Sequence, residues 1–253
     1  MDDCQVGDRG RVIRRLRDRV RFAGREVRCP VCEGRFGRFR LTEGGPLELE
    51  CPRCGSRPRQ RLLWLYLSAE RLLASRGLRI LHLAPERCIE RRLRSLEGAD
   101  YVTVGIENPL ADVRADCTAL PFEDGSFDTA VSFWTHTDID DLLAAMREVA
   151  RVLRPEAPFV YVGCHPCFVG PHSVFVAAEG VPEFHPGYRP SRRYDASAPG
   201  VANPDGVRAR VGGVHLTLHD FFGAFTEAGF RIERIEELGD RDYPHVVALR
   251  ARR

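Results

Sequence analysis

Short apolar runs alternate with longer amphipathic patterns through most of this chain. The apolar runs have the length of buried parallel strands, and breaks rich in polar residues, Pro or Gly follow them. Such alternation of strands and helices predicts a doubly wound α/β sheet. Five parallel strands are predicted at residues 80–83, 101–106, 112–117, 129–134 and 159–162.

Helical periodicity is clearest at residues 138–153, where apolar residues recur every three or four positions. Asp138 can cap the start of this helix, and Pro155 ends it. A shorter helix is expected after the break at residues 84–86, with Gly98 as its stop.

The C-terminal part predicts one more helix and two strands. Thr217 can cap a helix at residues 217–228. The strands at 230–237 and 246–251 are joined by a short polar link, so we expect them to pair antiparallel.

Residues 164–216 interrupt this regularity. They are rich in Pro, Gly, His and aromatic residues and have little periodicity. They follow the fifth strand, on the edge of the sheet where ligands bind, so we expect them to cover a substrate.

Four cysteines carry the strongest local signal. They form the pattern C-x2-C, eighteen residues, C-x2-C. Two such pairs can aim four sulfurs at one ion, which predicts a structural zinc ribbon at residues 25–60, with a hairpin turning at Gly44-Gly45. Buried thiols without metal are the alternative. The expected metal ligands are Cys29, Cys32, Cys51 and Cys54.

Two further helices are expected around the ribbon. Residues 8–22 are amphipathic and very basic, so a helix within residues 1–24 is either solvated, which we favour, or anchors a phosphate or an anionic lipid. Residues 61–77 are expected to link the ribbon to the following domain.

Composition narrows the possible partners. The net charge of +2 gives no general argument for binding nucleic acid. No apolar run approaches a membrane span, and the N-terminus has no signal-like apolar core. We therefore expect a cytoplasmic protein with reduced cysteines and no membrane partner.

Glu107 stands at the tip of the second predicted strand, where a carboxylate can accept both hydroxyls of a ribose. This position suggests a nucleoside cofactor. A second metal site at Cys164-His165-Pro166-Cys167 is an alternative use of that stretch, but it has no obvious fourth ligand.

Several stretches together resemble the class I S-adenosylmethionine-dependent methyltransferases, in particular a subgroup with a zinc ribbon. They are CPVC…CPRCGS, RLLWLYL, ILHLAPE, GIENPLADV, LPFEDGSFD and AMREVARVLRP. The resemblance implies a Rossmann-like sheet of seven strands, mostly parallel with an antiparallel last strand, in a methyltransferase domain at residues 78–253.

The resemblance also implies how the cofactor, S-adenosylmethionine, would be held. The loop after the first strand lacks the usual glycines. Either Glu86 contacts the cofactor's ammonium group, as the subgroup favours, or the site has lost the cofactor. The implied cofactor-binding residues are His82, Ala84, Pro85, Glu86, Glu107, Asn108, Asp116, Cys117 and Phe133.

A phenol, alcohol or amide acceptor needs a base, and His136 and His165 follow the fourth and fifth strands. Each could instead only orient the substrate, because proximity alone can drive methyl transfer. The expected substrate-binding residues are Trp134, His172, Tyr188 and His215.

These features favour methyl transfer to a small molecule, plausibly a specialised metabolite, because the aromatic covering segment could close a pocket. One alternative is an RNA methyltransferase that grips RNA with the ribbon and the Arg-rich N-terminus. Another is a non-catalytic zinc-ribbon interaction protein with a degenerate cofactor loop.

Overall fold

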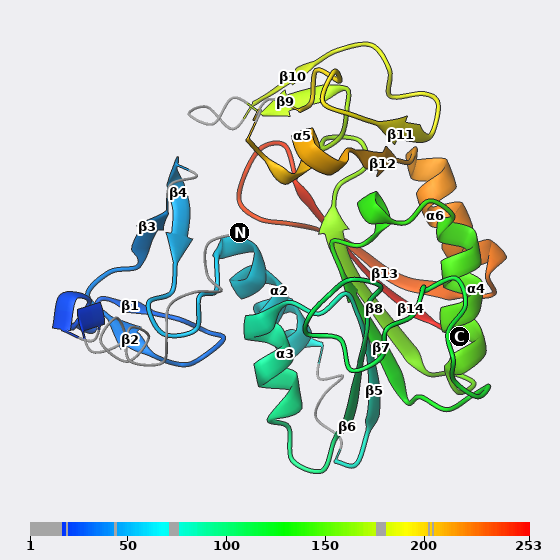
Figure 1. Cartoon of the computed structure of the whole chain (residues 1–253), viewed down its shortest axis with the longest axis horizontal. Helices are drawn as coiled ribbons and strands as arrows, with labels where there is room; N and C mark the ends of the chain where they lie inside the picture. Colours follow the sequence, from blue (N-terminus) through cyan, green and yellow to red (C-terminus); the bar gives the residue numbers. More distant parts are fainter. Residues whose placement is uncertain are drawn as a thin grey trace. The chain divides into compact units, whose positions relative to one another are not determined.

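The computed structural model describes residues 17–18, 20–42, 45–70, 76–175, 181–201, 203 and 205–253. Contacts divide the chain into two compact units, which we describe separately (Figure 1). The first contains the described parts of residues 1–73 together with 86–96, and the second contains the remaining described residues. The basic helix predicted within residues 8–22 lies largely outside the described residues.

The first unit contains two small antiparallel hairpins. β1 (Val27–Arg28) pairs with β2 (Arg35–Phe36), and β3 (Arg40–Thr42) pairs with β4 (Gly45–Glu50). The first cysteine pair lies between β1 and β2, and the second follows β4. The pairing of β3 with β4 confirms the hairpin predicted between the two cysteine pairs; its turn residue Gly44 lies outside the described residues.

Two helices complete the first unit: α2 (Pro58–Ala69) and α3 (Arg87–Arg94). Pro58 occupies the first turn of α2, where its missing N–H loses no intrahelical bond. The N–H of Arg57 donates to the Gln60 side chain at 2.7 Å. Because of these two features α2 begins at Pro58, earlier than the start predicted for the linking helix at 61–77. Residues 71–75 of that prediction lie outside the described chain.

A six-stranded sheet forms the centre of the second unit, in the order β13-β14-β8-β7-β5-β6. β6, β5, β7 and β8 are mutually parallel, and β14 is antiparallel to both of its neighbours. A mostly parallel sheet whose last strand is antiparallel is therefore confirmed. The strands are β5 (Arg79–Leu83), β6 (Asp100–Val104), β7 (Thr129–Phe133), β8 (Pro158–Cys164), β13 (Arg231–Leu238) and β14 (Val246–Arg252).

The strand predicted at 112–117 is reduced to a single parallel bridge between Val113 and Val104. The N–H of Thr103 donates to Asp112 Oδ2 at 3.0 Å, and the N–H of Asp112 donates to the Thr103 hydroxyl at 2.8 Å. Side chains thus replace the backbone pairing that a longer strand would need. The sheet of the described residues has six strands rather than the predicted seven.

Two helices, α4 (Leu142–Val152) and α6 (Leu218–Glu227), pack against one face of this sheet. The Phe159 ring of β8 stacks on Phe225 of α6, with centroids 5.9 Å apart, and Met146 of α4 is buried in the same cluster. These contacts bury the apolar stripe from which α4 was predicted, and the apolar face of α6.

The starts of α4 and α6 are set by different capping residues. The Asp141 side chain accepts from the N–H of Ala144 at 2.9 Å, so α4 begins later than a cap at Asp138 predicts. Asp138 instead ends a short 3₁₀ turn, η1 (His136–Asp138). Thr217 caps α6, as predicted.

The covering segment, residues 164–216, has more structure than predicted. β9 (Ser173–Phe175) pairs with β10 (Pro182–Phe184), and β11 (Arg192–Tyr194) pairs with β12 (Gly213–His215). A short helix, α5 (Val207–Val211), precedes β12. Each strand has three residues, too few to show a period in the sequence. Figure 1 shows these elements beyond the end of β8.

Within the described parts of the chain, every helix is too short or too polar to cross a membrane.

Candidate functional site

Three neighbouring parallel strands end together at one edge of the sheet. Leu83 of β5 is in register with Val104 of β6 and with Ser132 of β7. The residues that follow these strands therefore meet at the carboxyl edge, which is where open α/β sheets bind ligands.

The loop after β5 has a backbone that usually requires glycine. Ala84 adopts φ +52°, in the left-handed region, and its N–H donates to the Val104 carbonyl at 2.8 Å. The carbonyl of Pro85 accepts from Asn108 Nδ2 at 2.9 Å. Asn108, predicted to bind the cofactor, thus joins the loops after β5 and β6.

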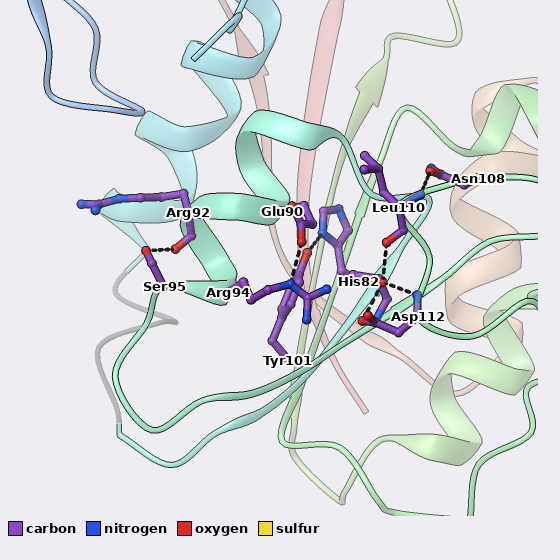
Figure 2. A network of polar contacts seen from close by, with 10 residues as sticks. His82, Glu90, Arg92, Arg94, Ser95, Tyr101, Asn108, Leu110 and Asp112 are labelled. Carbon is purple, nitrogen blue, oxygen red and sulfur yellow. Dashed lines mark hydrogen bonds and ion pairs between the residues drawn. The ribbon is translucent and has the colours of Figure 1, made fainter. Parts of the chain in front are cut away.

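His82 is fully buried on β5. Its Nδ1 lies 2.6 Å from the Tyr101 hydroxyl (Figure 2). Its ring packs edge-on against Phe133, with centroids 4.9 Å apart. Its Nε2 is buried and has no hydrogen-bond partner among the described residues. Burial lowers the pKa of His82 to about 3, so the ring is neutral.

Two of the three acidic residues implied in cofactor binding, Glu107 and Asp116, are exposed. Glu107 has no ion pair or hydrogen bond within the described chain. Asp116 Oδ1 accepts from the N–H and the hydroxyl of Thr118, both at 2.9 Å, which holds the pKa of Asp116 below its usual value. Burial raises the pKa of the neighbouring Cys117 to about 11, so this thiol is protonated.

Glu86 belongs to the first unit. It stands at the N-cap of α3, and its Oε1 pairs with Arg59 at 3.0 Å. Its Oε2 is buried without a hydrogen-bond partner among the described residues. The carboxylate is therefore held by an arginine of its own unit.

Two aromatic residues lie at the end of β7: Phe133 is its last residue, and Trp134 follows it. Phe133 is buried against His82, whereas Trp134 is partly exposed and adopts φ +56°. The N–H of Trp134 donates to the Val162 carbonyl at 2.9 Å. A left-handed backbone is uncommon for so bulky a residue, and strained residues of this kind often occur at ligand sites.

His136, the first candidate base, is enclosed. It is 2% exposed, and its Nδ1 is hydrogen-bonded to the Tyr161 hydroxyl. Phe221 of α6 packs edge-on against its ring at 5.1 Å. Burial, with a smaller contribution from Arg208, lowers the pKa of His136 to about 3.

His165, the second candidate base, uses both ring nitrogens. Nδ1 accepts from the N–H of Cys167 at 3.2 Å, so Nε2 carries the proton and faces Glu237 at 3.0 Å. Burial lowers the pKa of His165, while Glu237 acts in the opposite direction.

Three predicted substrate-binding residues lie together in the covering segment. The rings of His172 and His215 are 4.9 Å apart, and Tyr188 packs edge-on against both, at 5.3 and 5.6 Å. The Tyr188 hydroxyl accepts from the N–H of Leu218 at 2.8 Å. This cluster is therefore tied to the first turn of α6.

Arg208 of α5 ties the covering segment to the turn after β7. Its guanidinium donates to the Thr137 hydroxyl at 2.8 Å and to Asp138 Oδ1 at 2.5 Å. Arg208 was not predicted from the sequence, and neither were Tyr101 and Tyr161, the partners of two histidines. No local pattern marks these residues, since each acts on a residue far away in the chain.

The first unit brings the four predicted metal ligands together. All four sulfur atoms lie within 4.8 Å of one another. Cys29 and Cys54 are 3.7 Å apart, as are Cys32 and Cys51. Tetrahedral coordination with Zn–S of about 2.3 Å requires sulfur separations of about 3.8 Å. The cluster therefore has the size of a zinc site.

Two polar residues that the sequence analysis missed support this cluster. Ser56 is fully buried, and its hydroxyl lies 3.2 Å from the sulfurs of both Cys29 and Cys54. The Arg61 guanidinium donates to the carbonyls of Ser56 and Leu49, at 2.6 and 2.9 Å. A cation is thereby fixed in the unit that holds the four cysteine sulfurs.

The alternative metal site at residues 164–167 does not form. Among the described residues, only the four-cysteine cluster brings three or more such ligands together. His165 Nδ1 accepts from the N–H of Cys167, and the Cys167 thiol lies 3.3 Å from the Tyr188 hydroxyl. These contacts direct the side chains away from a common ion.

Comparisons with known proteins agree with this geometry. Residues 83–161 match the family of methyltransferase domains. The fold resembles an S-adenosylmethionine-dependent methyltransferase from Mesorhizobium loti, with a TM-score of 0.59 and 20% identity over 76% of this chain and 98% of the other. The chain therefore contains a methyltransferase domain, an enzyme domain, on the fold of S-adenosylmethionine-dependent methyltransferases.

A curated relative matches over a shorter stretch. Sixty residues are 37% identical to the sterol 4-C-methyltransferase strm-1 of Caenorhabditis elegans, covering 24% of this chain. This match spans 18% of the length of that relative.

Proposed function

We propose that this protein transfers the methyl group of S-adenosylmethionine to a small-molecule acceptor. The observation that carries the proposal is that β7, β5 and β6 end together at one edge of the sheet. Phe133, Ala84 and Glu107 stand at or just after these ends. The match of residues 83–161 to methyltransferase domains supports the same activity.

The residues at this edge fit the cofactor in three ways. Glu107 offers an exposed carboxylate that can accept two ribose hydroxyls. His82 has a buried Nε2 that lacks a partner among the described residues. Ala84 makes the tight turn in which glycine usually stands. When bound, S-adenosylmethionine supplies an electrophilic methyl group on its sulfonium sulfur.

The chain's own contribution is to place the acceptor, exclude water and receive a proton where one is released. Trp134, at the end of β7, can cover the acceptor, and positioning of this kind lowers the barrier by several kcal/mol. Glu237 would stabilise the charged form of His165, but its Nδ1 already accepts from the N–H of Cys167 and must give up this bond before it can receive a proton. His136 is enclosed, and its low pKa opposes protonation.

A small acceptor is supported by the covering segment and by the relative that acts on a sterol. The depression of about 660 Å³ lined by residues 193–197 and 209–212 is open to solvent and contains none of the predicted substrate-binding residues, so it does not support the acceptor class. The low net charge does not favour RNA.

We further infer that Cys29, Cys32, Cys51 and Cys54 hold one structural Zn²⁺ ion. Negative charges on four sulfur atoms within 4.8 Å of one another repel, so all four thiols lose their protons together only around a cation. Four protein ligands leave no position for substrate, which makes the metal structural.

The proposal is tested by incubating the zinc-loaded protein with S-adenosylmethionine that carries a labelled methyl group. Small-molecule extracts and total RNA are offered as acceptors in separate reactions. Label in the small-molecule fraction is the expected result. Label in the RNA fraction would show that RNA, not a small molecule, is the acceptor. Cofactor binding without transfer to either fraction would refute the proposed acceptor class.

A further inference from the structure

The helix α5 of the covering segment contributes no side chain to the core. All of its residues are exposed or partly exposed, whereas every residue of the following strand β12 is buried. Within the described chain, no backbone hydrogen bond joins residues 207–211 to another element. Segments with few buried contacts open at a low cost in free energy, so α5 can move while β12 stays in place.

One side chain holds α5 in its position. The Arg208 guanidinium donates to the Thr137 hydroxyl at 2.8 Å and pairs with Asp138 Oδ1 at 2.5 Å, and both acceptors lie in η1. Among the described residues, no other side chain of α5 forms a hydrogen bond to another element. The Asp138 side chain is 56% exposed, and an ion pair so open to water is weak and screened by salt. The contact can therefore break and form again.

Glycine stands at both ends of α5. Gly206 is the N-cap, and Gly212 follows the last residue with φ +67° and ψ −152°, a conformation that residues with a side chain rarely adopt. A Cβ atom on Gly212 would lie 2.3 Å from the Tyr194 carbonyl oxygen, so only glycine fits there. Backbone rotation is freest at glycine, and hinges of moving segments are often such small residues.

The surroundings of α5 leave room for movement and for a ligand. Residues 209–212 form one wall of the open depression described above, and residues 193–197 form the other. Val207 and Val211 are 58% and 60% exposed, and their spacing of four residues places them on one face of the helix. Apolar residues that share a helix face usually pack against another surface, so this face suits an apolar ligand.

The position of α5 relates it to the edge of the sheet where the acceptor is proposed to bind. η1, to which Arg208 is bonded, begins two residues after Trp134, at the end of β7. Figure 1 shows α5 beyond the end of β8. When Arg208 leaves η1, the approach to this edge widens.

We propose that α5 is a gate that admits the methyl acceptor to the carboxyl edge of the sheet. The ion pair between Arg208 and Asp138 is its latch, and Gly206 and Gly212 are its hinges. The exposed valines of α5 contact the acceptor, which selects for an acceptor with an apolar surface. The part played by the acceptor rests on the proposed function, whereas the opening of α5 does not.

Limited digestion of the zinc-loaded full chain with trypsin tests the latch, because cleavage after Arg210 requires α5 to open. Its rate is divided by the rate of cleavage after Arg250 of β14, which reports unfolding of the sheet. Asp138→Asn should raise this ratio about two- to fivefold, the change expected on loss of an exposed ion pair. Asp124→Asn, which removes an exposed ion pair with Arg151, is the matched control and should leave the ratio unchanged.

High salt provides a second measurement on the latch, which does not depend on the folding of a variant. It should raise the same ratio in wild type, because salt screens the ion pair between Arg208 and Asp138. A ratio that neither Asp138→Asn nor salt increases would overturn the latch.

The variant Val211→Ser tests the contact with the acceptor, in the labelled-methyl reaction with small-molecule extracts. Transfer should fall about threefold or more, because apolar burial is lost, while cofactor binding stays as in wild type. Val181→Ser changes an exposed valine outside α5 and should alter neither. Absence of cofactor binding to wild type would refute the proposed function together with the acceptor's part. Normal cofactor binding and undiminished transfer in Val211→Ser would overturn the gate alone.

Discussion

Two fully buried histidines should make the stability of the second unit fall below neutral pH. Burial lowers the pKa of His82 and of His136 to about 3, against about 6.5 in an unfolded chain. Below pH 6.5 the unfolded chain binds two protons that the folded chain does not bind. The stability that these groups contribute is complete above this pH and is lost progressively as the pH falls toward 3.

The size of the effect follows from the two pKa shifts. Each proton changes the free energy of unfolding by about 1.4 kcal/mol per pH unit within this window. Between pH 7 and pH 5, each histidine should therefore cost about 2 kcal/mol, and the pair about 4 kcal/mol. This is a large share of the stability of an ordinary domain.

Denaturant unfolding between pH 5 and pH 7 measures this slope. A Trp64→Phe background leaves Trp134 as the only tryptophan, and it reports on the second unit. His136→Gln should remove about half of the pH dependence attributed to the pair, whereas His185→Gln, which changes a partly exposed histidine, should leave it unchanged. An unchanged slope in His136→Gln would refute the reasoning.

Two further predictions concern the cofactor loop and the ribbon. Ala84→Gly should raise the melting temperature by about 2–4 °C, because glycine removes the strain of a left-handed backbone, which costs about 1 kcal/mol. Ala144→Gly in α4 is the control and should lower the melting temperature. A lower melting temperature in both variants would show that Ala84 is not strained. Ser56→Ala should weaken zinc binding about 10- to 100-fold in chelator competition, because the hydroxyl next to two sulfurs is lost. Ser68→Ala on α2 is the control. Equal zinc affinities of the two variants would show that Ser56 does not support the metal site.

The sequence predicted most of the sheet, because buried parallel strands leave continuous apolar runs. β5, β7 and β8 follow such runs, and the link after β13 indicated the antiparallel pair. The strand predicted at 112–117 is reduced to one bridge at Val113, because the side chains of Thr103 and Asp112 bond to each other's backbone N–H groups. That exchange depends on two residues nine positions apart and leaves no periodic signal.

Residues of the candidate site could be predicted only where a short stretch of sequence carries the signal. The paired cysteines predicted the cluster of four sulfurs, and Glu107 stands at the end of an apolar run. The enclosure of His136 could not be predicted, because Tyr161 and Phe221 reach it from distant parts of the chain. Burial of this kind depends on packing, which composition does not encode.

Calorimetric titration of S-adenosylmethionine into wild type, Glu107→Ala and Glu227→Ala tests the central claim most directly. Glu227 is an exposed carboxylate on α6 and serves as the matched control. The account predicts saturable binding to wild type, equal binding to Glu227→Ala and a loss of about tenfold or more in Glu107→Ala, since a charge-assisted hydrogen bond is worth about 1.5–3 kcal/mol. Absence of binding to the folded, zinc-loaded wild type would contradict the proposed activity.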